Sequence, residues 1–184
     1  GKIIMSATPL FNNLEITLSL VTKLIAEQFP QWSHLSIKPV EPSGWDNRTF
    51  RLGQHMSIRL PSAERYAQQV QKEQKWLPLL APHLSLAIPQ PLAMGQPSNN
   101  YPFNWSVYGW IEGESANTVL IDELHLQLLA LRLAQFLNEL HKIDATGGPL
   151  PGSHNFYRVT HHWSMMRRQD RPLFNYKALL MLML

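Results

Sequence analysis

The stretch SGWDNRTFRLG, residues 43–53, decides the fold of this chain. A strand-forming run, Thr49–Leu52, follows a short polar turn made by Asp46, Asn47 and Arg48, and a glycine stands near each edge. Two interpretations fit this pattern. Asp and Asn are ordinary turn residues, so the stretch is typical of a hairpin. Backbone N–H groups in such a turn can also face a phosphate, so the stretch also fits a loop that closes over a phosphate.

The sequence around this stretch predicts a small meander of strands. Three short strands are expected, at Ser36–Val40, Asn47–Leu52 and Met56–Leu60, and Gly53-Gln54 is a hairpin signal between the last two. Apolar residues at helical spacing predict an amphipathic helix before them, from Asn13 to Gln28, capped by Asn12 or Asn13.

Two more helices and two more strands are expected after the meander. Ser62 caps a helix at Ala63–Leu80, and the longest helix follows at Ile121–Ile143. Between these helices, Trp105–Ile111 is strongly strand-like. The prolines in Ile88–Met94 confine that segment to an edge strand or an extended run.

Composition limits the classes of protein to consider. The chain has 184 residues, of which 45% are hydrophobic and 16% charged, as in a globular domain. It has no cysteine, which excludes disulfides and thiol catalysis within it and favours the cytoplasm. The net charge of +3 suits a phosphorylated ligand as well as nucleic acid. No apolar run is long enough for a membrane span, and we expect no membrane partner.

Six stretches together resemble the aminoglycoside phosphotransferase family, whose members have a protein-kinase-like fold. They are SGWDNRTFRLG, SIRLP, QVQKEQKWLPLLAPHL, IPQPLAMGQP, WSVYGWIEGE and LAQFLNELHKIDATGGPLPGSHNFYR. The match covers about Ser36 to Arg158, with the stretches in consistent order. The resemblance implies an α+β fold. A kinase-like N-lobe, with a five-stranded, mostly antiparallel sheet and a crossing helix, would be followed by a truncated helical portion of the C-lobe.

The expected organisation has four parts. Residues 1–108 form the N-lobe with its N-terminal helix, 109–117 the hinge, and 118–158 the start of the helical C-lobe. The tail at 159–184 departs from the family pattern. It reads like a chain that is truncated or continued out of frame, which the nucleotide sequence would test.

The resemblance assigns phosphate-handling roles to two charged residues. Arg59, in SIRLP, takes the basic position on the third strand, where lysine is usual, and Glu73 takes the carboxylate position on the following helix, where it would orient Arg59. Without the resemblance, Arg59 would be read as a surface residue and Glu73 as a solvated helix residue.

The resemblance also implies where the nucleotide lies. Asp46, Asn47 and Arg48 would form the loop over the phosphates, although a plain hairpin stays an alternative. In the hinge, the Gly109 carbonyl and the Ile111 N–H would pair with adenine, and a shift of the alignment by one residue would move both.

Three aromatic residues of the hinge strand have two interpretations. Tyr108 would line the back of the nucleotide pocket. Core packing is the alternative for Trp105, Tyr108 and Trp110, and at most two of them would touch a ligand.

The catalytic loop of the family is largely missing. An H-G-D-x-x-x-x-N pattern is required, and only Asp170 has an asparagine at that spacing, Asn175, without the His and Gly. No aspartate follows for a second metal contact. No metal-ligand set is therefore predicted, although ATP and Mg²⁺ are the cofactors that the family implies.

The basic and histidine-rich tail admits other functions. His154, His161 and His162 could bind a metal, but no carboxylate pair accompanies them. The tail also holds a group of basic residues that lack interleaved aromatics, so a solvated basic helix is favoured over nucleic-acid binding. This group is Arg167, Arg168, Arg171 and Lys177.

Two functions are therefore carried forward. One is an ATP-dependent O-phosphotransferase that acts on a hydroxyl of an aminoglycoside or another small molecule; a role in antibiotic resistance would rest on family analogy alone. The alternative is a catalytically inactive nucleotide-binding or dimerising module. In either case the expected partners are a nucleotide and a second copy of the chain, joined through exposed apolar helices.

Overall fold

A computed structural model describes residues 15–41, 44, 46–114 and 122–148 of the chain. Its helices are α1 (Leu18–Gln28), α2 (Glu64–Leu80) and α3 (Glu123–Lys142), with short 3₁₀ turns η1 (Pro30–Trp32) and η2 (Ala81–His83). Its strands are β1 (Ile37–Pro39), β2 (Asn47–Leu52), β3 (Met56–Pro61), β4 (Pro91–Gly95) and β5 (Trp105–Gly109).

The strands form one five-stranded sheet in the order β1-β2-β3-β5-β4, and every neighbouring pair is antiparallel. The predicted antiparallel sheet is confirmed. So is the edge position of the proline-containing strand, because a proline in a central strand would leave a ladder position without a donor. Gly53 turns β2 into β3 with φ at 58°, a conformation that glycine adopts without steric cost.

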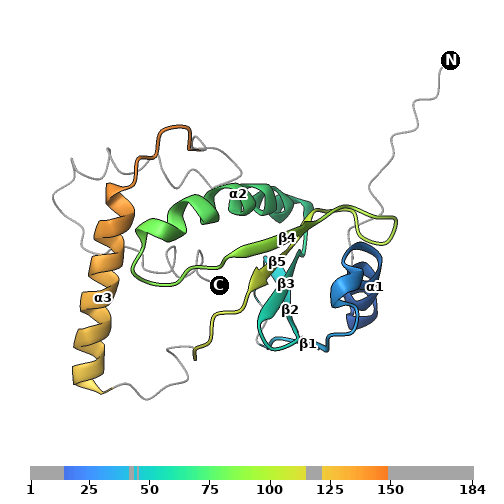
Figure 1. Cartoon of the computed structure of the whole chain (residues 1–184), viewed down its shortest axis with the longest axis horizontal. Coiled ribbons are helices and arrows are strands. Elements are labelled where there is room, and N and C mark those ends of the chain that lie inside the picture. The colour runs from blue at the N-terminus through green and yellow to red at the C-terminus, as the bar shows by residue number, and fades with distance from the viewer. Residues whose placement is uncertain (1–14, 42–43, 45, 115–121, 149–184) are drawn as a thin grey trace.

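One face of the sheet is apolar and packs on α1. Phe50 and Leu52 of β2 lie opposite Ile58 and Met56 of β3, and alternation puts these residues on one side of the pleat. The core that they form also takes in Val21, Leu24 and Ile25 of α1 and Trp105 and Val107 of β5. Figure 1 shows α1 lying against the β1–β3 side of the sheet.

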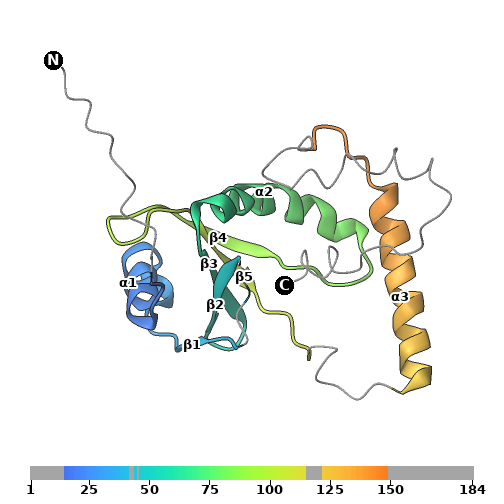
Figure 2. The same cartoon turned by 180° about the vertical axis from the view of Figure 1, so that it is seen from behind.

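The other face carries polar side chains and meets α2. The residues that alternate with the core positions are Asn47, Thr49 and Arg51 on β2, Ser57 and Arg59 on β3, and Ser106 and Tyr108 on β5. Helix α2 runs over this face beside β4 and β5, and Figure 2 shows it from behind, between α1 at one end of the molecule and α3 at the other. The apolar face thus forms the core, and the polar face carries the side chains that can contact a ligand.

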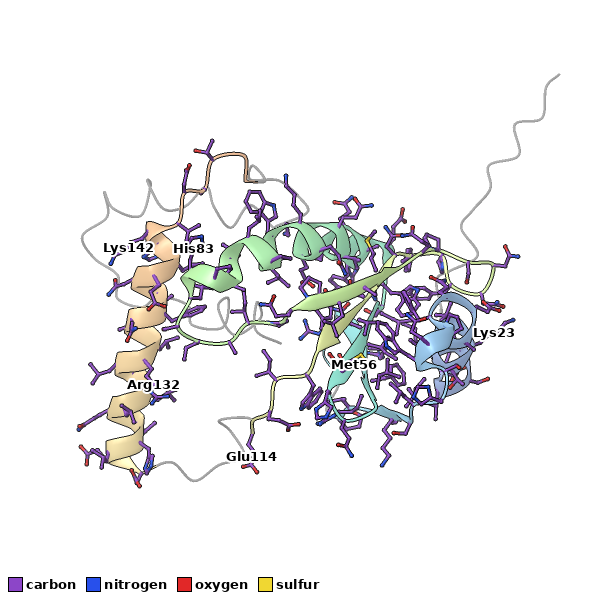
Figure 3. The ribbon with its side chains drawn as sticks, in the orientation of Figure 1. Lys23, Met56, His83, Glu114, Arg132 and Lys142 are labelled. Atoms are coloured by element: carbon purple, nitrogen blue, oxygen red, sulfur yellow. The ribbon has the colours of Figure 1, made fainter. Side chains whose placement is uncertain are left out.

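Helix α3 stands beyond the end of α2 and away from the sheet (Figure 1). The Ser85 N–H donates to Glu139 at 2.6 Å and ties the segment after α2 to this helix. Figure 3 shows His83 and Lys142 where the ends of η2 and α3 approach each other, and it shows Arg132 on α3 away from the sheet. Only Phe136 of α3 is buried.

Two predicted caps are wrong. Helix α1 begins at Leu18, later than expected, and its cap is Thr17, whose hydroxyl accepts from the Leu20 N–H. Ser62 does not cap α2, because its hydroxyl donates instead to the Asp46 carbonyl at 3.1 Å. A polar residue before a helix has other acceptors within reach, and here the residue that precedes β2 supplies one.

No helix in the described ranges combines the length and the apolar content that a membrane crossing requires.

Candidate functional site

The polar face of the sheet centres on Arg59. Its backbone lies opposite Thr49 of β2 on one side and Ser106 of β5 on the other, so its side chain rises from the middle of the polar face. The side chain is half-buried. No hydrogen bond or ion pair from its guanidinium occurs within the described residues, so its donors are available to a ligand.

Tyr108 lies beside Arg59, one strand over, and is 1% exposed. The guanidinium carbon of Arg59 sits 5.2 Å from the centre of the Tyr108 ring, within the range of a cation–π contact. The Tyr108 hydroxyl donates to Oε2 of Glu73 on α2. Burial, and then the negative charge of Glu73, raise the pKa of Tyr108 well above its usual range, so the phenol stays protonated and a donor.

Gln74 fixes the position of α2 over the sheet. Its Nε2 donates to the Ser106 hydroxyl and to the Ala93 carbonyl, both at 3.0 Å. Because Gln74 follows Glu73 directly, two consecutive helix residues bind two alternate residues of β5. The carboxylate therefore has a defined place above the strand.

The expected direct contact between Glu73 and Arg59 is replaced by a contact through Tyr108. The two residues form no ion pair in the part of the chain that the structure describes. Each contacts a different part of the same phenol, Arg59 the ring and Glu73 the hydroxyl. The three side chains thus gather on one face of the sheet, with the Tyr108 phenol between Arg59 and Glu73.

The predicted phosphate loop is only partly a loop. Asn47 and Arg48 are the first residues of β2, and Asp46 alone belongs to the connection from β1. Asp46 is held by its carbonyl, which accepts from the Ser62 N–H at 2.9 Å and from the Ser62 hydroxyl. Asn47 is on the same face of β2 as Thr49, toward Arg59.

Arg48 lies on the opposite face of β2 from Arg59. Alternation along the strand puts it with Phe50 on the α1 side, and it lines a small hollow there with Leu18. Its Nη1 donates to the Gly44 carbonyl at 3.0 Å. Arg48 therefore contacts the loop backbone, while its guanidinium lies on the side of the sheet away from Tyr108.

The backbone at the start of the hinge is partly hydrogen-bonded to its neighbours. The Gly109 N–H donates to the Gln90 carbonyl, and the Trp110 N–H donates to the His55 carbonyl at 2.8 Å. Among the residues that the structure describes, the Gly109 carbonyl and the Ile111 N–H have no hydrogen-bond partner. These are the two groups that the sequence predicts for base pairing.

A basic residue that the sequence analysis did not single out, Arg51, supports the hinge. Its guanidinium stacks 4.1 Å from the Trp110 ring centre and pairs with Glu112. This pairing lowers the pKa of the Glu112 carboxyl. The available signal was alternation, because Arg51 shares the face of Thr49 on β2 and so points to the same side as Arg59.

The aromatic residues of the hinge strand divide between core and site. Trp105 is fully buried in the apolar core, as the packing alternative expects. Tyr108 contacts Arg59 and Glu73 on the polar face. Trp110 stacks under Arg51.

The remaining candidates lie outside the described residues. They are Asp170, Asn175, His154, His161, His162 and the basic group of the tail. Within the described ranges, no group of three or more histidine, aspartate or glutamate side chains is placed to hold a metal ion. The residues present there do not fit a magnesium site.

Comparison with known proteins gives one family and a set of similar structures. Residues 36–180 match the model of the phosphotransferase enzyme family. The matched range includes most of the stretch set apart as 159–184, and the boundary at 158 stays a prediction. No protein among the curated proteins matches the chain.

Two solved structures illustrate the likeness. A complex of APH(2″)-IIIa with GDP and kanamycin is 25% identical with a TM-score of 0.63, over 85% of this chain and 54% of that one. A GDP complex of a mutant aminoglycoside 2′-phosphotransferase-IIIa is 25% identical with a TM-score of 0.61, over 88% of this chain and 48% of that one. The chain thus spans about half the length of these proteins, and its sheet with α2 corresponds to their kinase-like N-lobe.

Proposed function

Because the chain belongs to the phosphotransferase enzyme family, we propose that it provides the nucleotide-binding part of an ATP-dependent O-phosphotransferase. The acceptor would be a hydroxyl of an aminoglycoside or of another small molecule. Transfer of the γ-phosphoryl would be direct and in line, so the protein contributes mainly position and charge.

One observation supports this proposal most directly. Arg59 has unused donors on the polar face of the sheet, and its strand, β3, pairs with β5, which leads into the hinge. A guanidinium with free N–H groups matches the oxygens of a triphosphate in charge and in geometry. The Gly109 carbonyl and the Ile111 N–H offer an acceptor and a donor for a base. The two ends of a nucleotide would thus each find a complementary group.

The identity of the nucleotide and the acceptor is part of the proposal. The two structures described above are complexes with GDP, and one of them also holds kanamycin. These ligands support nucleotide binding and an aminoglycoside acceptor here, and they make GTP a necessary comparison for ATP. Magnesium is implied by the reaction class, since it neutralises charge between the phosphates when bound.

The second candidate is a nucleotide-binding or dimerising module without turnover. Two observations favour it: the H-G-D pattern is absent, and α3 exposes five leucines, Leu124, Leu126, Leu128, Leu129 and Leu131. A row of exposed leucines is typical of a surface that a partner covers.

Two assays separate these functions. Calorimetry with ATP and GTP tests nucleotide binding, and release of ADP or GDP with an aminoglycoside panel tests turnover. Asp170→Asn is the control for the second assay, because Asp170 is the one candidate base in the sequence. Binding with turnover that the control abolishes supports the enzyme; binding without turnover supports the module. Absence of binding to either nucleotide contradicts the enzyme and the nucleotide-binding module, and it leaves only the dimerising form of the second candidate.

A further inference from the structure

We propose that Tyr108 is a positioning residue. Its ring holds the Arg59 guanidinium in place for a phosphate, and its hydroxyl couples Arg59 to Glu73. This inference rests on the proposed nucleotide-binding function. It concerns how this chain connects its helix carboxylate to its strand cation, which do not pair directly within the described residues.

The first step is the way in which Tyr108 holds Arg59. The guanidinium contacts the ring at 5.2 Å from its centre and forms no hydrogen bond in the described ranges. A cation–π contact attracts the charge through the ring face and uses none of the N–H donors. A direct ion pair with a carboxylate would occupy up to two of them. Arg59 is therefore restrained while its full set of donors stays open to phosphate oxygens.

The second step is the influence of Glu73 on the ring. The Tyr108 hydroxyl donates to the Glu73 carboxylate, and a phenol that donates to an anion carries more electron density in its ring. This increases the attraction of the ring for the Arg59 cation. The carboxylate also fixes the rotation of the phenol, since the hydroxyl has a charged acceptor on one side only.

The third step concerns helix α2. Glu73 belongs to this helix, so a shift of α2 would move the acceptor of the Tyr108 hydroxyl. Gln74 holds the helix to Ser106 and Ala93 at 3.0 Å, so Glu73 keeps its distance from β5. Tyr108 itself is buried and its strand lies between two neighbours. A movement of α2 would reach Arg59 through the phenol, and phosphate affinity would follow the position of the helix.

The test compares nucleotides with nucleosides in the full chain. Tyr108→Phe keeps the ring and removes the hydroxyl, so Arg59 keeps a partner but loses the contribution of Glu73. We expect affinity for ATP or GTP to fall roughly three- to tenfold, with affinity for adenosine or guanosine unchanged. Glu73→Gln should give a loss of the same kind, and the double variant should lose little more than either alone, because both changes break one connection.

The matched control is Tyr101→Phe. Tyr101 is also fully buried, and its hydroxyl donates to the Pro61 carbonyl at 2.7 Å. The Arg59 guanidinium lies over the ring of Tyr108 and not over that of Tyr101. This control should lower the free energy of unfolding but leave the ratio of nucleotide to nucleoside affinity unchanged.

Three outcomes would overturn the inference. Additive losses in the double variant would show that Tyr108 and Glu73 act separately. An equal loss for nucleoside and nucleotide in Tyr108→Phe would show a general structural role. An unchanged nucleotide affinity in that variant would remove Tyr108 from phosphate binding altogether. If the unaltered chain binds neither ATP nor GTP, the proposed nucleotide-binding function is wrong, and this inference, which rests on it, is wrong as well.

Discussion

Nη2 of Arg51 lies 2.7 Å from Oε1 of Glu112, and this ion pair joins β2 to the segment that leaves the sheet after β5. The Arg51 side chain is 28% exposed and the Glu112 side chain 75% exposed. The same guanidinium stacks on Trp110 and donates to the Gln54 carbonyl. A single arginine therefore contacts the β2–β3 turn and the hinge at once.

This ion pair predicts a pH-dependent contribution to stability. Arg51 lowers the Glu112 pKa below its ordinary value of 4.5. A carboxyl whose folded pKa is depressed stabilises the fold above its unfolded pKa and loses that contribution as pH falls through the folded value. Glu112→Gln should thus be less stable than the unaltered chain near neutral pH, by a small amount because the pair is exposed to water.

Chemical denaturation at neutral pH and well below pH 4.5 measures this difference. The difference should vanish at the lower pH, where Glu112 is neutral in both states. Glu114→Gln is the control, since Glu114 has no ion pair within the described residues. A difference of equal size at both pH values would mean that the Glu112 side chain acts without its charge.

The two arginines on opposite faces of the sheet predict opposite results. Arg59→Ala should weaken binding of ATP or GTP roughly tenfold, because a charged donor to phosphate is lost. Arg48→Ala should change it little, because Arg48 lies on the α1 face and its guanidinium donates to the Gly44 carbonyl there. Calorimetry on both variants gives the comparison. Equal losses would mean that the loop at 46–48 carries as much of the phosphate contact as the strand.

The hinge predicts a variant that loses base recognition. Ile111→Pro removes the N–H that we propose pairs with the base, and we expect affinity for nucleoside and nucleotide alike to fall roughly fivefold. Gly113→Pro, two residues on, is the control. Nucleoside binding by calorimetry is the measurement. If Ile111→Pro binds nucleosides normally, the register of base pairing is shifted, as the one-residue alternative allows.

The packing of Trp105 on Gly95 predicts a large effect of one methyl group. The two residues are paired across β4 and β5, and a Cβ on Gly95 would lie 1.9 Å from Cε2 of the indole. Because Trp105 is fully buried, its ring cannot move aside, and Gly95→Ala should cost about 1–3 kcal/mol or more. Gly113→Ala, whose Cβ would meet nothing within 4 Å, should cost far less. Urea denaturation of both variants tests this, and equal stability would mean that the indole has room to relocate.

The sequence predicts the strands and helices of this fold well because their patterns are local. Alternation marks β2 and β3, and Gly53 marks the turn between them. Caps are predicted less well, because a hydroxyl chooses among all acceptors within reach. Ser62 finds the Asp46 carbonyl, which the sequence places far from it along the chain.

The candidate site divides in the same way. The resemblance supplies Arg59, Glu73 and Tyr108, but their contacts depend on the pairing of β3 with β5 and on the seat of α2, which are set by tertiary packing. Sequence alone does not show that the Tyr108 phenol lies between Arg59 and Glu73, because Tyr108 belongs to a distant segment of the chain. The role of Arg51 depends on the path of the chain after β5, which no local pattern gives.

The exposed leucines of α3 predict that the chain associates with further copies of itself. Leu124, Leu128 and Leu131 follow the spacing of one helix face, and Leu124 and Leu131 are 73% and 69% exposed. Water contact with such a row is unfavourable, so we expect two or more copies to cover it.

Light scattering on the purified chain measures this association. The unaltered chain should be oligomeric, and the double variant Leu124→Glu, Leu131→Glu should fall to a monomer of 21.2 kDa. Gln127→Glu, an exposed change on the same helix, is the control and should leave the mass unchanged, because it adds charge without removing apolar surface. A sharp monomer for the unaltered chain would show that this face is covered within one copy, and the dimerising alternative would then lose its main support.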